Sequence, residues 1–404
     1  MLSVPEAFAQ ILRTVQPATP RSCSLFEATH SVLAEDAVSD VNIPPFDKAL
    51  MDGFAVRSSD VPDGTGTLQI QEVIYAGSVP TRSLEAGQTS QIMTGAPLPE
   101  GADAVVQIEH CQINEAEQTV QIKTTPVAPG KNMLYRASVL EQGATVVKAG
   151  TFLRAQEIGA LAETGSPQIS VRRTPSVAIL ATGDELVPPE KRPEAGQIRN
   201  SNEVMLHSQI LQADARPVPL GIARDERSHL REKIQEGLKS DFLLLSGGVS
   251  AGELDLVPAE LAAAGVKQVF HKVNLKPGKP LWFGILEQEG RAPCYIFGLP
   301  GNPVSSMVCF ELFVRSALRQ SLGFPDPMPQ PVSARLTADF QSRGDRPTYQ
   351  PARIDWSEGE ATVTPLKSMG SADLHAAVAA NGIALFATGN QLYQRGLSID
   401  TFLW

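Results

Sequence analysis

The chain has few cysteines and no excess of positive charge. Its cysteines form no C-x-x-C pair, so neither a zinc-ligand pattern nor a redox pair is indicated, and structural disulfides are not expected. Acidic residues outnumber basic ones by 44 to 34, which gives a formal net charge of −10. Because this balance would not neutralise nucleic acid phosphates or an anionic membrane surface, neither partner is expected. The four cysteines are Cys23, Cys111, Cys294 and Cys309.

Long apolar runs are also missing. No 18 consecutive apolar residues occur, which excludes a transmembrane helix. The first residues lack a basic segment followed by a continuous apolar stretch, so a secretory leader is not indicated. Instead Phe8, Ile11, Leu12 and Val15 recur at helical spacing, which predicts an amphipathic helix. The expectation is a soluble, cytoplasmic protein.

What the chain does contain is ordinary globular composition. It has 404 residues, of which 42% are hydrophobic and 19% charged, and a chain of this length is expected to form two to four domains. The 32 glycines and 31 prolines are spread along the whole sequence, which indicates many turns and several small lobes. The pattern predicts a discontinuous N-terminal domain (1–26 plus 137–172), a β-rich insert (27–136), an α/β domain (173–325) and a small β-barrel-like domain (326–404).

Regular alternation of strand and helix begins near residue 175. Such alternation over about 150 residues predicts an open, mainly parallel sheet. The predicted helices cover 203–211, 227–238, 256–264 and 304–322. The predicted strands cover 177–181, 217–222, 242–245, 266–273, 281–285 and 295–297.

Four unusual loops follow apolar strands of this domain, at 182–185, 246–250, 276–280 and 298–303. Ligands of open α/β sheets bind beyond the carboxyl ends of the strands, where backbone N–H groups are free. The loop at 246–250 has Gly247 and Gly248 directly after a buried strand, which fits a phosphate cradle as well as a turn needed only for chain geometry. No P-loop or dinucleotide motif is present.

Charged residues surround these loops. Lys276 and Lys279 flank a Pro-Gly turn, where they would clamp a compact oxyanion or simply remain solvated. Carboxylates stand at several strand ends, where they would act as helix caps or, together with ligand phosphates, would hold Mg²⁺. These carboxylates are Asp184, Glu185, Asp225, Glu253 and Asp255.

Taken in order and spacing, six segments closely resemble the molybdopterin molybdenumtransferases, the MoeA family whose eukaryotic relative is the gephyrin E domain. The resemblance extends over nearly the whole chain. It implies an α/β multidomain fold with four domains, including a central open α/β domain of the MogA-like molybdopterin-binding type. The six segments are 44–54, 94–99, 182–186, 246–250, 276–280 and 298–303.

The resemblance also implies a reaction and an assembly. Adenylylated molybdopterin and molybdate react, with Mg²⁺, to give molybdenum cofactor and AMP. The site would lie between the third domain of one subunit and the second domain of its partner in an elongated homodimer. Transient contact with the adenylyltransferase of the same pathway is implied as well.

Site residues carried over from the resemblance fall into three groups. The catalytic group is Asp52, Glu185 and Asp225, and the metal ligands are Glu253 and Asp255. The substrate-binding group is Thr94, Asp184, Ser246, Gly247, Gly248, Ser250, Lys276, Lys279, Pro300 and Asn302.

Two positions depart from the family pattern. An acidic pair commonly following Arg136 is replaced by Ser138 and Val139, after Ala137. An arginine is replaced by Pro351, for which Arg346 or Arg353 would substitute. Two alternatives therefore stay open: a non-catalytic molybdopterin-binding or scaffold protein, and a molybdopterin adenylyltransferase on the same α/β domain.

Overall fold

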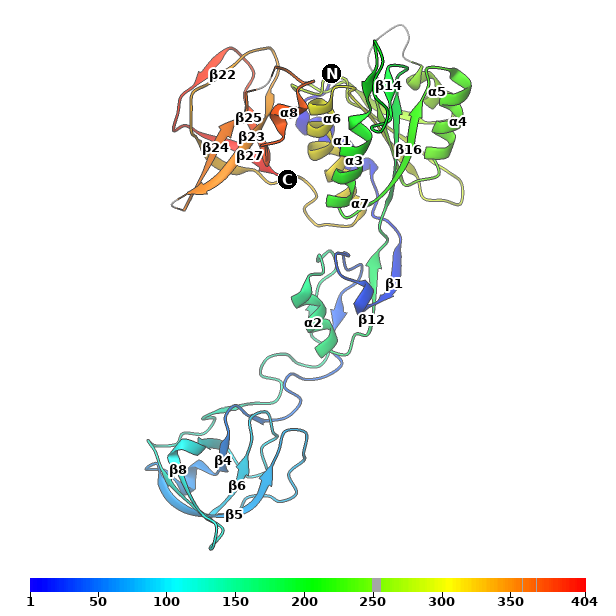
Figure 1. Ribbon diagram of the computed structural model, residues 1–404. Coiled ribbons are helices and arrows are strands. Elements are labelled where there is room, and N and C mark those ends of the chain that lie inside the picture. The colour runs from blue at the N-terminus through cyan, green and yellow to red at the C-terminus, as the bar shows by residue number, and fades with distance from the viewer. Residues whose placement is uncertain (249–255, 358, 368) are drawn as a thin grey trace.

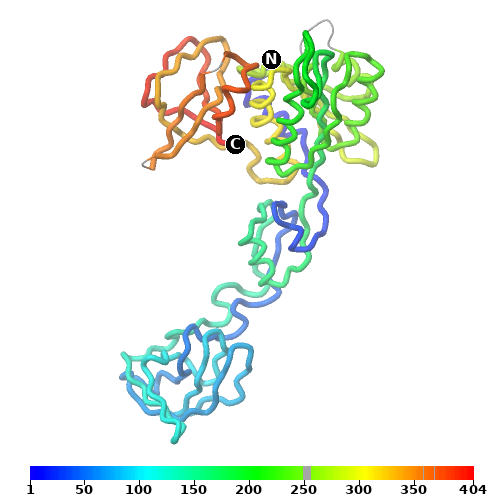
Figure 2. Tube along the Cα trace, in the orientation of Figure 1, coloured from blue at the N-terminus to red at the C-terminus, as the bar shows by residue number. Residues whose placement is uncertain are grey.

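The computed structural model describes residues 1–248, 256–357, 359–367 and 369–404. The molecule is elongated, with a broad upper part, a narrow middle and a separate lower lobe (Figure 1). The backbone trace passes down to the lower lobe and returns, so that two segments far apart in the sequence run side by side through the middle (Figure 2). The paired strands here are β1 (Pro20–Ser24) and β12 (Gln168–Arg172), which are antiparallel.

A six-stranded sheet forms the centre of the α/β domain. Across the sheet its strands are β16 (Arg216–Ala223), β13 (Ser176–Thr182), β17 (Phe242–Ser246), β20 (Cys294–Leu299), β19 (Trp282–Leu286) and β18 (Lys267–His271). The first four strands are parallel, and β19 is antiparallel to both of its neighbours. The mainly parallel α/β sheet predicted from the sequence is confirmed.

Helices cover both faces of this sheet. They are α3 (Ser201–Gln212), α4 (Arg227–Gly237), α5 (Val257–Ala263), and a continuous run formed by α6 (Pro303–Cys309), the π-helical turn η4 (Phe310–Val314) and α7 (Arg315–Ser321). A small parallel pair, β14 (Leu186–Val187) and β15 (Ile198–Arg199), stands beyond the end of β13.

Side chains of β17 show why the strand ends are held firmly. Phe242 and Leu244 enter the core shared with α3 and η4, whereas Leu243 and Leu245 enter the core shared with α4 and α5. All four are fully buried. Each such side chain contributes about 1.5–3 kcal/mol through removal of apolar surface from water. The loop that follows β17 therefore starts from a rigid point.

Helix α1 (Val4–Thr14) corrects one predicted domain boundary. Its side chains Val4, Ala7 and Ile11 are buried in the core of the α/β domain, and the Phe8 ring lies 4.9 Å from that of Phe313. The grouping of 1–26 into the N-terminal domain was wrong for this helix. The apolar face of α1 is buried instead against the helical run 303–321, on the far side of the β1–β12 ribbon.

The middle and lower parts are built mainly from short strands. The middle contains the β1–β12 pair, β2 (Ala37–Val38) paired with β11 (Thr145–Val147), the turn η1 (Leu25–Glu27) and α2 (Ala155–Glu163). The lower lobe has a six-stranded sheet in the order β7 (Ala104–Gln107), β4 (Gly53–Val56), β6 (Gln88–Ile92), β5 (Thr65–Ile74), β9 (Thr119–Lys123) and β8 (Cys111–Asn114). It also contains β3 (Lys48–Ala49) paired with β10 (Met133–Leu134), and the turns η2 (Ser58–Asp60) and η3 (Ile108–His110).

The C-terminal domain is a closed barrel, which confirms the prediction of a small all-β domain. Its strands, in order, are β21 (Val332–Leu336), β24 (Glu360–Pro365), β23 (Thr348–Ser357), β25 (Gly382–Phe386) and β27 (Ser398–Leu403). A pair β22 (Phe340–Ser342) and β26 (Gln391–Tyr393) and a short helix α8 (Leu374–Ala377) accompany it. In the described part of the chain, none of the helices has the length and apolar character that crossing a membrane requires.

An ion pair joins the ribbon to the α/β sheet. Arg173, next after β12, donates Nη1 to Oδ2 of Asp241 at 2.8 Å. The backbone N–H and the hydroxyl of Ser176 also donate to that oxygen, at 2.7 and 2.8 Å. Burial alone would raise the pKa of Asp241, but hydrogen bonds from Arg173 and Ser176 outweigh it and hold the pKa below its ordinary value.

Replacing Asp241 with alanine is expected to destabilise the α/β domain by about 2 kcal/mol, because Arg173 and Ser176 lose a partly buried acceptor. A lowered native pKa means that this contribution is present at neutral pH and is lost as the pH falls through the lowered value. The difference between wild type and variant in urea unfolding should therefore shrink on acidification. Asp355→Ala, which removes an exposed pair with Arg353, is the control and should change stability by less than about 0.5 kcal/mol.

Candidate functional site

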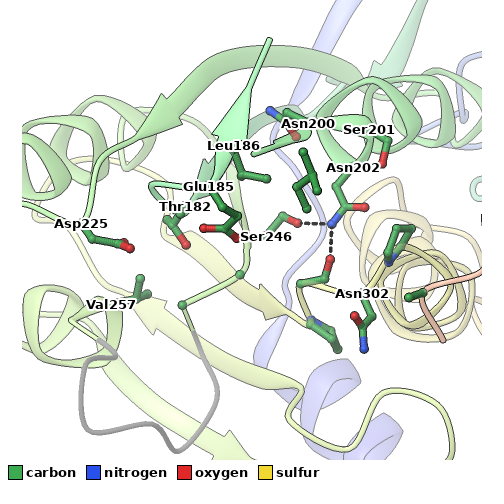
Figure 3. Close-up of a pocket in the computed structure, with 18 of the residues that line it drawn as sticks. Thr182, Glu185, Leu186, Asn200, Ser201, Asn202, Asp225, Ser246, Val257 and Asn302 are labelled. Atoms are coloured by element: carbon green, nitrogen blue, oxygen red, sulfur yellow. Dashed lines mark hydrogen bonds between the residues drawn. The ribbon is translucent and has the colours of Figure 1, made fainter. Parts of the chain in front are cut away.

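Loops from the carboxyl ends of β13, β17 and β20 surround a cavity of about 780 Å³. Parallel strands end at one edge of a sheet, so segments distant in the sequence meet there. Figure 3 shows side chains from these loops and from the start of α3 around this cavity. Seven of the residues predicted from the sequence line it: Glu185, Asp225, Ser246, Gly247, Gly248, Pro300 and Asn302.

The two glycines after β17 meet a geometric requirement. Gly247 and Gly248 have φ of +94° and +65°, a conformation that L side chains rarely adopt. A Cβ on Gly247 would lie 2.8 Å from the carbonyl oxygen of Thr182, and one on Gly248 would lie 2.7 Å from Cγ2 of Val257. Chain geometry therefore needs both glycines, and the same turn forms part of the cavity wall.

Asn202 ties the walls of the cavity together. Its Nδ2 donates to the hydroxyl of Ser246 at 2.7 Å and to the carbonyl oxygen of Gly301 at 2.8 Å (Figure 3). Ser246 is the last residue of β17, and Gly301 belongs to the loop after β20. The side chain comes from the first turn of α3, which begins after Asn200, whose side chain accepts from the backbone N–H of Glu203.

The carboxylates at this edge separate into two positions. Glu185 and Asp225 line the cavity. Asp184 accepts a hydrogen bond from the backbone N–H of Asp225 at 3.2 Å and lines a neighbouring cavity of about 850 Å³. The structure therefore places Asp184 on the wall of that neighbouring cavity, and its contact with substrate stays a prediction.

The predicted lysines lie in a different cavity, of about 590 Å³, which is called the second or lysine cavity below. Lys276 and Lys279 line it, and Pro280, Pro300 and Asn302 line both this cavity and the first. The lysine loop pairs with the C-terminal domain, since the backbone N–H of Lys276 donates to the carbonyl oxygen of Pro347 at 2.9 Å. The two cavities are neighbours within a single subunit.

One of the two candidate arginines lines the lysine cavity. Arg346 lines the lysine cavity, and its Nη1 donates to the carbonyl oxygen of Leu275 at 2.9 Å. Arg353 instead pairs with Asp355 on the exposed surface of the barrel. Arg346 is therefore the arginine that faces the lysines, in the same cavity as Pro351.

Asp52 and Thr94 form a separate pair in the lower lobe. The carboxylate of Asp52 accepts from the backbone N–H of Thr94 at 2.7 Å and from its hydroxyl at 2.6 Å. The hydroxyl and then the backbone N–H of Thr94 hold the pKa of Asp52 below its ordinary value. Asp52 directly precedes β4, at the opposite end of the subunit from the α/β domain (Figure 1). One chain alone therefore does not bring this pair to the cavities.

Comparison with known proteins identifies the family. Three family models match the chain: the MoeA N-terminal region (domain I and II) at 2–165, a probable molybdopterin binding domain at 178–320, and the MoeA C-terminal region (domain IV) at 333–404. A molybdopterin molybdenumtransferase of Staphylococcus aureus strain COL is 32% identical over 410 residues, which cover 100% of this chain and 95% of that protein. The chain belongs to the MoeA family.

Other members of the MoeA family are similar over the same length. The molybdopterin molybdenumtransferase of Bacillus subtilis strain 168 is 31% identical over 408 residues, covering 100% of this chain and 94% of that protein. The crystal structure of a molybdopterin biosynthesis MoeA protein from Pyrococcus horikoshii OT3 has a TM-score of 0.83 at 28% identity and covers 100% of both chains. The predicted fold, and the predicted assignment to the transferase enzymes, are confirmed.

Three predicted residues of this MoeA chain, Ser250, Glu253 and Asp255, lie outside the described residues. Within the described ranges, no group of three or more histidine, cysteine, aspartate or glutamate side chains is arranged to hold a metal ion. A metal site built from protein ligands alone is therefore not found in that part of the chain.

Sequence reasoning missed several residues that line the two cavities. Asn202 belongs to the first cavity, and Thr348 and Ser371 belong to the second. The N-cap pattern before α3 would have indicated the position of Asn202, but not its contacts. No sequence signal would have placed the C-terminal residues Thr348 and Ser371, because their position depends on how the barrel packs against the lysine loop.

Proposed function

We propose that this MoeA protein inserts molybdate into adenylylated molybdopterin, releasing molybdenum cofactor and AMP. The observation that carries the proposal is the pair of adjoining cavities that share Pro280, Pro300 and Asn302. One is lined by a glycine turn and carboxylates, as a phosphate-linked nucleotide requires. The other is lined by Lys276, Lys279 and Arg346, as a compact dianion requires.

Cationic focusing explains how a chain with a net charge of −10 would still bind a dianion. The positive side chains act at short range inside one cavity, whereas the negative excess is spread over the molecule and is screened beyond about 8–10 Å. Arg346 is part of this set in place of an arginine at position 351. Its Nη1 donates to the carbonyl oxygen of Leu275 and its Nε pairs with Asp345, so Nη2 is the nitrogen that would donate to an oxyanion.

Magnesium fits the donors of the first cavity. Mg²⁺ is usually held by one or two carboxylates together with ligand phosphates, so the lack of a three-residue cluster in the described ranges does not conflict with it. Glu185 and Asp225, which the resemblance places in the catalytic group, line this cavity and would also hold the ion, which would neutralise phosphate charge when bound. The metal roles of Glu253 and Asp255 remain part of the proposal, as does cytoplasmic location.

The position of Asp52 and Thr94 supports a site completed by a second subunit. In one chain they lie at the far end from the cavities (Figure 1). The hydrogen bonds from Thr94 that lower the pKa of Asp52 favour its ionised form, so Asp52 would enter the partner's cleft as an anion and hydrogen-bond acceptor. We therefore include a homodimer, arranged so that domains of two subunits meet, in the proposal.

The proposal is tested by incubating purified protein with adenylylated molybdopterin, molybdate and Mg²⁺. Release of AMP and of molybdenum cofactor that depends on molybdate supports insertion. Binding of molybdopterin without consumption of the adenylylated substrate would instead support a scaffold protein. That alternative stays open because Ser138 and Val139 replace an acidic pair of the family. Formation of adenylylated molybdopterin from ATP would support an adenylyltransferase.

Replacing Glu185 with glutamine should raise the Mg²⁺ concentration needed for half-maximal turnover by about tenfold, because a neutral amide is a weaker ligand for a hard cation than a carboxylate. The melting temperature should be unchanged, and excess Mg²⁺ should restore part of the rate. Glu194→Gln, on the exposed connection between β14 and β15, is the matched control. Superimposable titrations for wild type and Glu185→Gln would remove Glu185 from the metal site.

A further inference from the structure

The segment Pro300–Asn302 is a wall shared by the two cavities. Pro300 and Asn302 face both of them. Within the same subunit the segment is held at two points, since the hydroxyl of Ser306 donates to the carbonyl oxygen of Pro300 at 2.6 Å and Nδ2 of Asn302 donates to the hydroxyl of Ser371 at 2.9 Å. Its position therefore affects the shape of both cavities.

A third tether to this segment comes from Asn202, which lines the first cavity but not the lysine cavity. One amide group holds the carbonyl oxygen of Gly301 at 2.8 Å and the hydroxyl of Ser246 at 2.7 Å. The side chain is 8% exposed and is carried by a helix whose Glu203 accepts from the backbone N–H of Gly221 at 2.9 Å. The helix that carries the amide is thus anchored to the sheet.

The other half of this amide shows that Asn202 does more than fill space. Among the described residues, its buried Oδ1 has no hydrogen-bond partner. An unpaired buried acceptor is costly, and an apolar side chain of similar size would avoid that cost. In Figure 3 the nitrogen of the amide points to Ser246 while the oxygen points away from it. The two N–H groups are what this position provides.

We propose that Asn202 is a positioning residue that fixes the Pro300–Asn302 segment against Ser246 and thereby sets ligand affinity in both cavities. The identity of the ligands rests on the proposed function: AMP represents the nucleotide end in the first cavity, and molybdate is the oxyanion of the second. Asn202 would act on molybdate without touching the cavity that binds it.

The test measures binding of AMP and of molybdate separately by calorimetry, with full-length protein. In Asn202→Ala both dissociation constants should rise at least about tenfold, since two hydrogen bonds that orient the shared segment are lost. Asn202→Asp keeps the shape of the side chain, and its carboxylate can accept a hydrogen bond from the hydroxyl of Ser246. A carboxylate oxygen would, however, face the carbonyl oxygen of Gly301 and repel it. This variant should also raise the dissociation constants of both AMP and molybdate, and it tests the proposal if the alanine variant fails to fold.

Gln209→Ala is the matched control. Gln209 lies on the same helix, is 7% exposed, donates through Nε2 to Glu311 at 2.7 Å and also has an unpaired buried oxygen among the described residues. It contacts neither loop through a hydrogen bond in the described part of the chain. Its removal should lower the melting temperature about as much as Asn202→Ala, with both affinities unchanged.

The outcomes separate this inference from the proposed function. If AMP binding weakens but molybdate binding does not, Asn202 acts in one cavity only and the inference is overturned. Equal weakening of both ligands in Gln209→Ala would show a general stability effect and would overturn it too. A wild-type protein that binds neither ligand would overturn the proposed function and, with it, this inference.

Discussion

A heterodimer of two inactive variants is expected to regain about half of the wild-type activity per dimer. The two chains are Asp52→Asn and Lys279→Met, co-expressed with different tags and purified through both. At molybdate concentrations below saturation, Asp52→Asn alone should lose at least about a hundredfold in rate because it lacks a carboxylate at the site, and Lys279→Met alone about tenfold to a hundredfold because it lacks an oxyanion contact. In the mixed dimer, the α/β domain of the first chain and the lower lobe of the second form one intact site.

The reciprocal pairing is the control for this experiment. Placing both substitutions in one chain, with a wild-type partner, should leave no intact site if each site combines two subunits. The same heterodimer would keep about half of the activity if each site were made by one chain. A stable monomer with full activity, seen by sedimentation, would contradict assembly of the site from two subunits.

Lys279→Met should weaken molybdate binding about tenfold to a hundredfold, because the aliphatic part of the side chain is kept and a charge-assisted contact is lost. Lys279 faces the same cavity as Lys276 and Arg346, so the remaining cations would preserve part of the affinity. The measurement is the molybdate dependence of cofactor formation at saturating adenylylated molybdopterin.

Lys267→Met provides the matched control for the lysine variant. Lys267 is in the same domain, on the surface, where it pairs with an exposed Glu287. It should leave both the molybdate dependence and the melting temperature unchanged, because exposed ion pairs contribute little. Unchanged molybdate dependence in Lys279→Met would place the oxyanion elsewhere.

Local patterns were enough to predict the α/β domain and several of its loops. The run 242–245 is apolar throughout, as a strand buried on both faces must be, and the structure buries it on both faces. Glycine and proline marked the loops at Gly247, Lys276 and Pro300 because such turns depend on backbone conformations that neighbouring residues impose. These are properties of a few adjacent residues, so the sequence alone revealed them.

Other features depended on contacts between distant segments. The apolar face of α1 was evident from spacing, but the spacing did not say which of several apolar surfaces would cover it. Arg346 and Arg353 are equivalent as sequence, and only the packing of the barrel on the lysine loop turned Arg346 toward the cavity.

By itself the sequence determined the order of strands and helices in the α/β domain and the loops that carry Glu185, Gly247 and Lys276, because each is encoded by a short run of residues. Six such segments, taken together in order and spacing, also indicated the family. The tertiary structure alone decided that Asn202 bridges Ser246 at the end of β17 and Gly301 in the loop after β20, and that the cavities adjoin through Pro300–Asn302. It also placed Asp52 at the far end of the subunit. Hydrogen bonds between residues 44 and 99 positions apart have no local signature, since chain folding, not spacing, brings their partners together.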